Sequence, residues 1–249
     1  MPRRAAGIAA LFGLVLFLAM GPAMAQTFSL DLGDDAPGGT TGRIVQLLAL
    51  MTVLSLAPGI LITVTSFTRI AVVLSLLRAA LGAQQTPPNM VLVSLALFLT
   101  AFVMAPTFQQ AYDNGVAPLI AEEITEEQAL PLVAEPFHTF MLSQVRDKDL
   151  ELFMGMAQLD AVETPADTPF KVLIPAFMIS ELRRAFEIGF LVFLPFLIID
   201  MVVASVLMSM GMMMLPPIMI ALPFKLIFFV MVDGWYLVAG SLVRSFGTV

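Results

Sequence analysis

Four long apolar segments dominate this chain. The first runs from Ile44 to Thr68, where 25 consecutive residues carry no charge, and the second is Met90–Tyr112. Two more follow at Glu181–Met210 and Ile218–Phe246. Each is long enough to cross a bilayer as an α-helix, which takes about 20 residues. The pattern therefore predicts an all-α integral membrane protein with four long apolar helical segments.

Prolines and glycines indicate where these segments bend or turn. Pro58-Gly59 lies in the middle of the first segment, where a kink or a break is expected. Gly82–Pro88 predicts the turn of a first helical hairpin, and Gly211–Pro217 predicts the turn of a second. The two hairpins are accordingly predicted at residues 44–112 and 181–249.

A region of different chemistry, residues 113–180, separates the two hairpins. It contains twelve acidic residues and three basic ones, so it faces water. Its apolar residues still recur at helical spacing, which predicts two or three amphipathic helices. Phe137, Phe140 and Phe153 belong to this pattern. Packing in the core of these helices is the favoured interpretation, and lining of a pore is the alternative.

The N-terminal residues 1–25 have the pattern of a secretory signal peptide. Two arginines precede an apolar run of the expected length, and a small-x-small motif ends at Ala25. Cleavage is expected between Ala25 and Gln26, with an uncleaved membrane helix as the alternative. Residues 26–43 then form a polar tether that is predicted to be flexible. Cleavage would place the mature N-terminus, the acidic region and the C-terminus outside the cytoplasm.

Composition narrows the chemistry further. Of the 249 residues, 59% are apolar and only 12% are charged, about half the charged share of soluble domains. The mean hydropathy is +0.95. Without cysteine and with His138 as the single histidine, thiol chemistry and a multi-histidine metal site are excluded, and no metal or cofactor is expected. The net charge of −7 argues against nucleic-acid binding.

Three charged residues, Asp200, Lys225 and Asp233, lie inside otherwise apolar segments. Such charges are costly in lipid, so they usually pair or face a protein interior. Counted from a hairpin tip at Met214, Asp200 and Lys225 differ in height by only ~5 Å, so they can pair. Asp233 could serve a neighbouring subunit. A proton or ion relay is one interpretation of these charges, and assembly of helices is the favoured one.

A second group of charges, Arg183, Arg184 and Glu187, lies on the third apolar segment. Their spacing predicts pairing on the helix surface or a contact between subunits. The chain shows no catalytic constellation: Ser180-Glu181, for example, has no histidine partner. The sequence therefore predicts a protein that is not an enzyme.

Five stretches carry a resemblance to a known family. They are Thr65–Arg78, Gln84–Asn89, Ile174–Phe190, Met210–Pro217 and Leu222–Trp235. In order and spacing they resemble the FliP family of the flagellar type III export apparatus, whose relatives also occur in virulence injectisomes. The cleavable signal peptide favours the flagellar branch. The resemblance covers roughly residues 44–246.

This resemblance implies a subunit of the export gate through which unfolded flagellar proteins leave the cytoplasm. It implies a homo-oligomer, expected to be a pentamer in a ring-like core with FliQ and FliR, that works with FlhA and FlhB. It also implies a place in the bacterial inner membrane at the flagellar basal body, with apolar helices that contact other subunits rather than lipid. The alternative function is a secondary transporter of ions or small solutes that uses the Asp200/Lys225 pair.

The Met-rich stretch at the second turn is the candidate gate. Met210, Met212, Met213 and Met214 surround a hairpin tip, where they cannot all face one core. Repeated around a ring, flexible thioether chains would close a pore against ions yet bend aside for a polypeptide. Ordinary core packing by methionine is the alternative.

Overall fold

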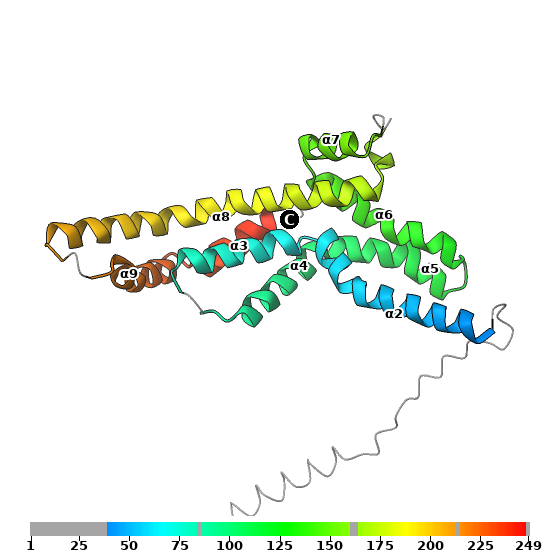
Figure 1. Ribbon diagram of the computed structural model, residues 1–249, viewed down its shortest axis with the longest axis horizontal. Coiled ribbons are helices and arrows are strands. Elements are labelled where there is room, and N and C mark those ends of the chain that lie inside the picture. Colours follow the sequence, from blue (N-terminus) through cyan, green and yellow to red (C-terminus); the bar gives the residue numbers. More distant parts are fainter. Residues whose placement is uncertain (1–38, 84–85, 160–163, 213–214, 248–249) are drawn as a thin grey trace, which may run out of the picture. The chain divides into compact units, whose positions relative to one another are not determined.

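The computed structural model describes residues 39–83, 86–159, 164–212 and 215–247, and every regular element in these ranges is a helix (Figure 1). The predicted all-α fold is thus confirmed. Backbone contacts divide the chain into two units, residues 1–53 and 54–249. The described part of the first unit is the beginning of helix α2, and all later helices belong to the second.

The first apolar segment is two helices, α2 (Gly39–Val64) and α3 (Phe67–Ala80). Helix α2 continues through Pro58, although an interior proline removes a backbone donor and disfavours a helix. The chain breaks instead at Thr65-Ser66, where the Phe67 N–H donates to the Thr65 hydroxyl at 3.4 Å. A break at Pro58-Gly59 is therefore not observed.

The second apolar segment, α4 (Asn89–Ala111), runs through a π-helical turn, η1 (Tyr112–Val116), into the short α5 (Ala117–Ile120). Two longer helices follow, α6 (Glu126–Gln144) and α7 (Asp147–Met156), with a 3-10 turn at η2 (Pro165–Asp167). They are the helices predicted for the acidic region.

Two local features shape this acidic region. A capping box starts α6, in which the Thr125 N–H donates to the Gln128 side chain at 3.1 Å. Gly115 lets η1 approach α6 closely, since a Cβ there would lie 2.5 Å from Val133 Cγ2. The polar turn after α5 and the close crossing together fold α6 back along α4.

The longest helix, α8 (Phe170–Ser209), begins eleven residues before the predicted start at Glu181. Glu181, the predicted first residue of this segment, therefore lies inside the helix, and its side chain is buried. The last apolar segment is also divided, into α9 (Pro217–Met231) and α10 (Gly234–Arg244), which meet at a bend of 65°. Asp233 takes a left-handed conformation at this bend, with φ of 51°.

Within the described residues, three helical stretches are long and apolar enough to cross a membrane. They are Leu47–Val64, Asn89–Ile120 and Phe170–Ser209, and the bent pair α9 and α10 makes a fourth if it counts as one span. The four predicted long apolar segments thus correspond to three such stretches and one bent pair of helices.

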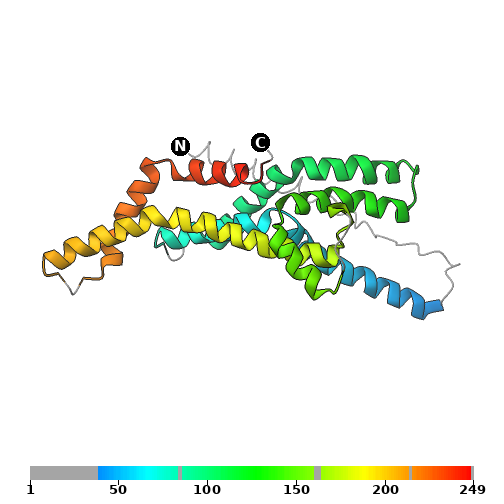
Figure 2. The same ribbon diagram turned by 90° about the horizontal axis from the view of Figure 1, so that it is seen from above.

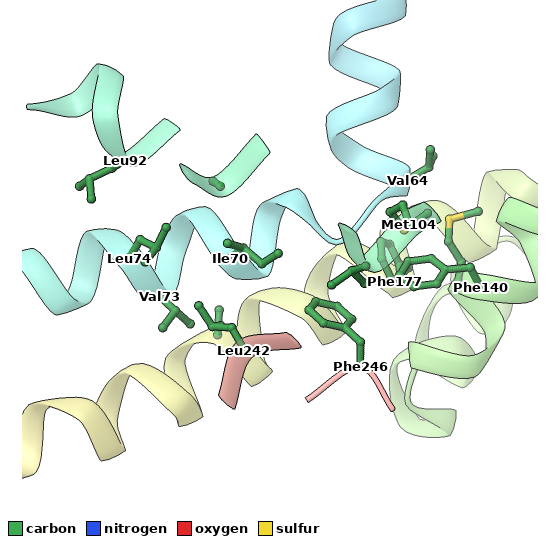
Figure 3. Close-up of a cluster of buried hydrophobic side chains, with 14 of the residues drawn as sticks. Val64, Ile70, Val73, Leu74, Leu92, Met104, Phe140, Phe177, Leu242 and Phe246 are labelled. Carbon is green, nitrogen blue, oxygen red and sulfur yellow. The ribbon is translucent and has the colours of Figure 1, made fainter. Parts of the chain in front are cut away.

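The core of the second unit forms where α3 packs along α8 (Figures 1 and 2). One face of α3 supplies Ile70, Val73 and Leu74 at helical spacing, all essentially without exposed surface. Figure 3 shows these side chains with residues from α4, α6, α8 and the chain's C-terminal segment. Because elements from the whole length of the second unit meet here, this core fixes the positions of the charged residues described next.

Candidate functional site: buried charges and a methionine-rich turn

The structure brings Asp200 and Lys225 together. Lys225 Nζ lies 2.6 Å from Asp200 Oδ2 and also donates to the backbone oxygen of Ala80 at 3.0 Å. Only 6% of the Lys225 surface is exposed. The contact with Ala80 was not predicted, and it places the ammonium group at the C-terminal, partly negative end of α3. Lys225 therefore links α9 to α8 and α3 at once.

The other charges of the apolar segments are less completely paired. Asp200 Oδ1 is buried and has no hydrogen-bond partner among the described residues. Asp233 is exposed at the bend between α9 and α10, and the structure shows no ion pair for it within those residues. The subunit thus joins two of the three predicted charges and leaves the third on its surface.

A larger polar cluster surrounds Arg69, which the sequence analysis did not single out. The Arg69 guanidinium is fully buried, and its Nε donates to Glu181 Oε2 at 2.9 Å. Its Nη2 contacts the second Glu181 oxygen and donates to Gln144 Oε1 at 3.0 Å. Its Nη1 donates to the Ser245 backbone oxygen and hydroxyl, each at 3.0 Å. One side chain on α3 therefore holds α6, α8 and the residues after α10.

The C-terminal segment completes this cluster. The Arg69 guanidinium carbon lies 3.7 Å from the centre of the Phe246 ring, in a cation–π arrangement. Gln144 Nε2 donates to the Phe246 backbone oxygen at 3.2 Å. A signal in the sequence could have revealed the site, because Arg69 shares a helix face with Val73 and Leu77, and a charge on an apolar face needs a buried partner.

The predicted group on α8 is divided between two environments. Arg183 Nε donates to Glu187 Oε1 at 2.8 Å, and both side chains are more than half exposed. Arg184 turns inward instead, where its Nη1 donates to Gln144 Oε1 at 3.0 Å. Arg184 thereby joins the edge of the Arg69 cluster.

A smaller cluster joins α7 to α8. Asp149 Oδ2 accepts from the Ser180 hydroxyl at 2.6 Å and from Arg146 Nε and Nη2 at 2.8 and 2.6 Å. Burial raises the pKa of Asp149, but the hydrogen bonds from Ser180 and Arg146 outweigh it, so the pKa lies below its usual value. The carboxylate is therefore charged at neutral pH and fixes the start of α7.

The three aromatic residues of the acidic region take different positions. Phe140 is buried, with its ring centre 6.0 Å from that of Phe177 and 6.3 Å from that of Phe246 (Figure 3). Phe137 packs at the edge of the same cluster and meets Phe108 edge to face. Phe153 is half-buried on α7. For Phe137 and Phe140 these positions favour core packing over pore lining.

Two methionines are exposed where the chain leaves α8. Met210 is 62% exposed and Met212 is 44% exposed, so neither packs in the core of its own subunit. Met213 and Met214 lie outside the described residues, as do Ala25 and Gln26 of the predicted cleavage site. Behind the turn, the facing sides of α8 and α9 leave an apolar cavity of about 560 Å³, lined by residues such as Val203, Leu207 and Phe224.

Taken together, long apolar helices, internally paired charges and a large exposed apolar surface define a helical membrane protein built for contact with lipid or other subunits. A model of the FliP family matches residues 50–242, and the chain belongs to that family. The resemblance inferred from the sequence is therefore confirmed.

Individual relatives agree with this assignment. The chain is 60% identical to the flagellar biosynthetic protein FliP of Caulobacter vibrioides over 245 residues, which cover 98% of this chain and 91% of the relative. It is 57% identical to the protein of the same name from Bacillus subtilis, over 81% of this chain and 91% of the relative. The FliP of Agrobacterium fabrum is 52% identical over 93% of this chain and 96% of the relative.

Proposed function

We propose that this chain is a subunit of the flagellar type III protein export channel and forms part of the gate through which unfolded flagellar proteins leave the cytoplasm. The match to the FliP family over residues 50–242 carries this proposal. The exposed methionines at the tip between α8 and α9 support the assignment of the gate to that turn. The subunit is a structural part of the channel and has no catalytic role.

The gate works by exclusion of water in this proposal. Met210, Met212, Met213 and Met214 from several copies would meet on one axis and form an apolar constriction. Such a constriction blocks ions because water does not wet it, so closure needs no charged plug. Methionine suits this role because its unbranched thioether chain adapts to irregular surfaces and can move aside for a passing polypeptide.

Assembly follows from the surface of the subunit. Large apolar side chains are exposed along α4, α8 and α9, for example Phe98, Phe190 and Met231. A surface of this kind is stable only against lipid or other protein. We propose a homo-oligomer, a pentamer, in a core with FliQ and FliR that works with FlhA and FlhB and passes unfolded flagellar proteins, without contact to nucleic acid.

The core lies at the inner membrane, in the flagellar basal body, and mostly outside the cytoplasm. In this proposal a signal peptide is cleaved after Ala25, so N-terminal analysis of membrane-assembled protein should begin at Gln26. Recovery of peptides that contain Arg3 and Arg4 would contradict cleavage. The mass of the native complex in mild detergent tests the assembly, since a monomer would contradict it.

The alternative of a secondary transporter receives no support from the comparisons, whose named relatives are flagellar biosynthetic proteins. The geometry of the charged pair also argues against a relay. Lys225 is held by both Asp200 and the Ala80 backbone, which suits a fixed structural contact.

Shortening the methionines tests the gate. With Met212, Met213 and Met214 changed to alanine, potassium efflux from cells should rise several-fold while the level of assembled complex stays the same. Met156→Ala is the control, because Met156 is also an exposed methionine but lies on α7, away from the turn. An assembled triple variant that leaks no more than wild type would show that these methionines do not close the pore.

A further inference from the structure

Helix α8 ends in a specific capping arrangement at Gly211. The Gly211 N–H donates to the Met208 oxygen at 3.1 Å, and the Met212 N–H donates to the Leu207 oxygen at 3.0 Å. This pair of bonds is the Schellman motif, which needs a left-handed residue just after the helix. Gly211 is that residue, with φ of 74°. The direction in which the chain leaves α8 is therefore set at Gly211.

Space does not explain why this position is glycine. A Cβ added at Gly211 would meet nothing within 4 Å. The requirement comes from the backbone alone, because a left-handed φ is unstrained for glycine, tolerated by asparagine and unfavourable for alanine. A substitution here consequently changes the preferred path of the chain without creating a clash.

The far side of the turn is also fixed. The Leu215 N–H donates to the Met212 oxygen at 3.3 Å, and the Met219 N–H donates to the Pro216 oxygen at 3.1 Å as α9 begins. Pro216 and Pro217 restrict φ on this side of the turn. Further along α9, Lys225 joins that helix to Asp200 on α8. The described residues on both sides of the turn are thus held by hydrogen bonds, and among them Gly211 is the one left-handed residue.

We propose that Gly211 is a positioning residue of the export gate: its left-handed conformation directs the chain after α8 so that Met212 reaches the constriction beside Met210. This inference rests on the proposed function of the methionines as the gate. Gly211 acts through the backbone and contacts no substrate. The effect of a substitution at Gly211 should therefore depend on whether the new residue tolerates a positive φ, and not on the size of its side chain.

The test compares three substitutions in full-length protein within the assembled complex. Gly211→Ala should raise potassium efflux from cells several-fold above wild type, because alanine favours a different exit from α8. Gly211→Asn is larger but tolerates the left-handed conformation, so its efflux should stay within about twofold of wild type. Gly247→Ala is the matched control, since Gly247 also has a positive φ of 68° and open space around its Cβ but lies beyond α10.

Each other outcome would overturn the proposal. Equal leakage from Gly211→Ala and Gly211→Asn would show that any side chain disturbs the turn. Leakage from Gly247→Ala would indicate a general effect of backbone strain. Loss of the complex in Gly211→Ala, with Gly211→Asn assembled, would assign the glycine to assembly. If the Met212–Met214 alanine variant leaks and Gly211→Ala does not, only the role of Gly211 fails. If neither variant leaks, the gate itself fails.

Discussion

Arg69 and Glu181 lie 112 positions apart in the sequence and form an ion pair in which neither side chain has any exposed surface. Burial of two charges is costly, and it is tolerated here because other groups satisfy the guanidinium. Gln144 and Ser245 accept its remaining hydrogen bonds, and the Phe246 ring covers it. The pair therefore acts as the junction at which α3, α6, α8 and the C-terminal residues meet.

Removal of one partner of this junction should be strongly destabilising. Arg69→Ala leaves the buried Glu181 carboxyl without its main partner, and loss of one partner costs about 3–5 kcal/mol in comparable buried pairs. The expected result is protein that is largely degraded in cells and that loses its fold in detergent at a lower temperature. Blotting of membrane fractions and a thermal melt of the purified protein measure both effects.

The exposed pair on α8 is the matched control for this prediction. Arg183→Ala removes an arginine from an ion pair with Glu187, but solvent screens that pair, so the loss should stay below about 1 kcal/mol. Equal stability of Arg69→Ala and Arg183→Ala would show that the buried junction contributes nothing specific.

Lys225 and Asp200 should behave as a structural pair with an additional backbone contact. Asp200→Ala and Lys225→Ala should each lower the amount of assembled complex. The first leaves the buried Lys225 ammonium without its carboxylate, and the second leaves the half-buried Asp200 carboxylate without its cation. The exchanged double variant, with lysine at 200 and aspartate at 225, should recover only part of it. The reason is that a carboxylate at 225 cannot donate to the Ala80 oxygen. Quantitative native gels provide the measurement.

The pattern of defects separates assembly from a relay. Normal complex levels in both single variants, together with lost export, would contradict the structural role. Full recovery in the exchanged variant would show instead that the Ala80 contact is unimportant.

The close crossing of α3 and α8 depends on Gly189. A Cβ at this position would lie 2.2 Å from Leu76 Cδ1 and 3.2 Å from Leu76 Cβ, so the leucine would have to move. Gly189→Ala should therefore be less stable than the equivalent Gly155→Ala by about 1–3 kcal/mol, the usual cost of overpacking. Gly155 lies in α7 with open space around it, so its change to alanine measures helix propensity alone.

A double-mutant cycle tests whether Gly189 and Leu76 are in close contact, because it compares variants with one another. Leu76→Ala creates room, so the double variant Gly189→Ala, Leu76→Ala should lose less stability than the sum of the two single variants. Thermal melts of wild type, the two single variants and the double variant in one detergent give the coupling free energy between the two positions. Additive effects would mean that the helices already separate enough to accept a methyl group.

Sequence periodicity was sufficient for the class of fold and for the Asp200–Lys225 contact, because apolar length and helical rise are local properties. Periodicity did not predict the features of the structure that depend on tertiary contacts. The third segment was predicted to start at Glu181, yet this residue lies inside α8, where its buried carboxylate pairs with Arg69. Similarly, the bend at Asp233 depends on Gly234, whose Cβ would lie 2.1 Å from the Phe229 ring.

Low pH should loosen α7 from α8 through Asp149. The pKa of this carboxyl is lowered in the folded protein, because hydrogen bonds from Ser180 and Arg146 outweigh the effect of burial. A lowered folded pKa contributes stability that is fully present above the ordinary value of about 3.9 and is lost as the pH falls through the folded value. The contribution should accordingly be constant from pH 7 to about pH 5 and fall below about pH 4.

Hydrogen exchange in α7 at a series of pH values, corrected for the intrinsic exchange rate, tests this linkage. Wild type should lose protection in α7 below about pH 4, whereas Asp149→Asn should be less protected already at pH 7 and should change less with pH. Asp147→Asn is the matched control, since Asp147 lies in the same first turn but is exposed and has no ion pair among the described residues. It should follow wild type. Identical pH profiles for Asp149→Asn and wild type would mean that a different group controls the docking of α7. The carboxylate that accepts hydrogen bonds from both Ser180 and Arg146 would then contribute nothing to that docking.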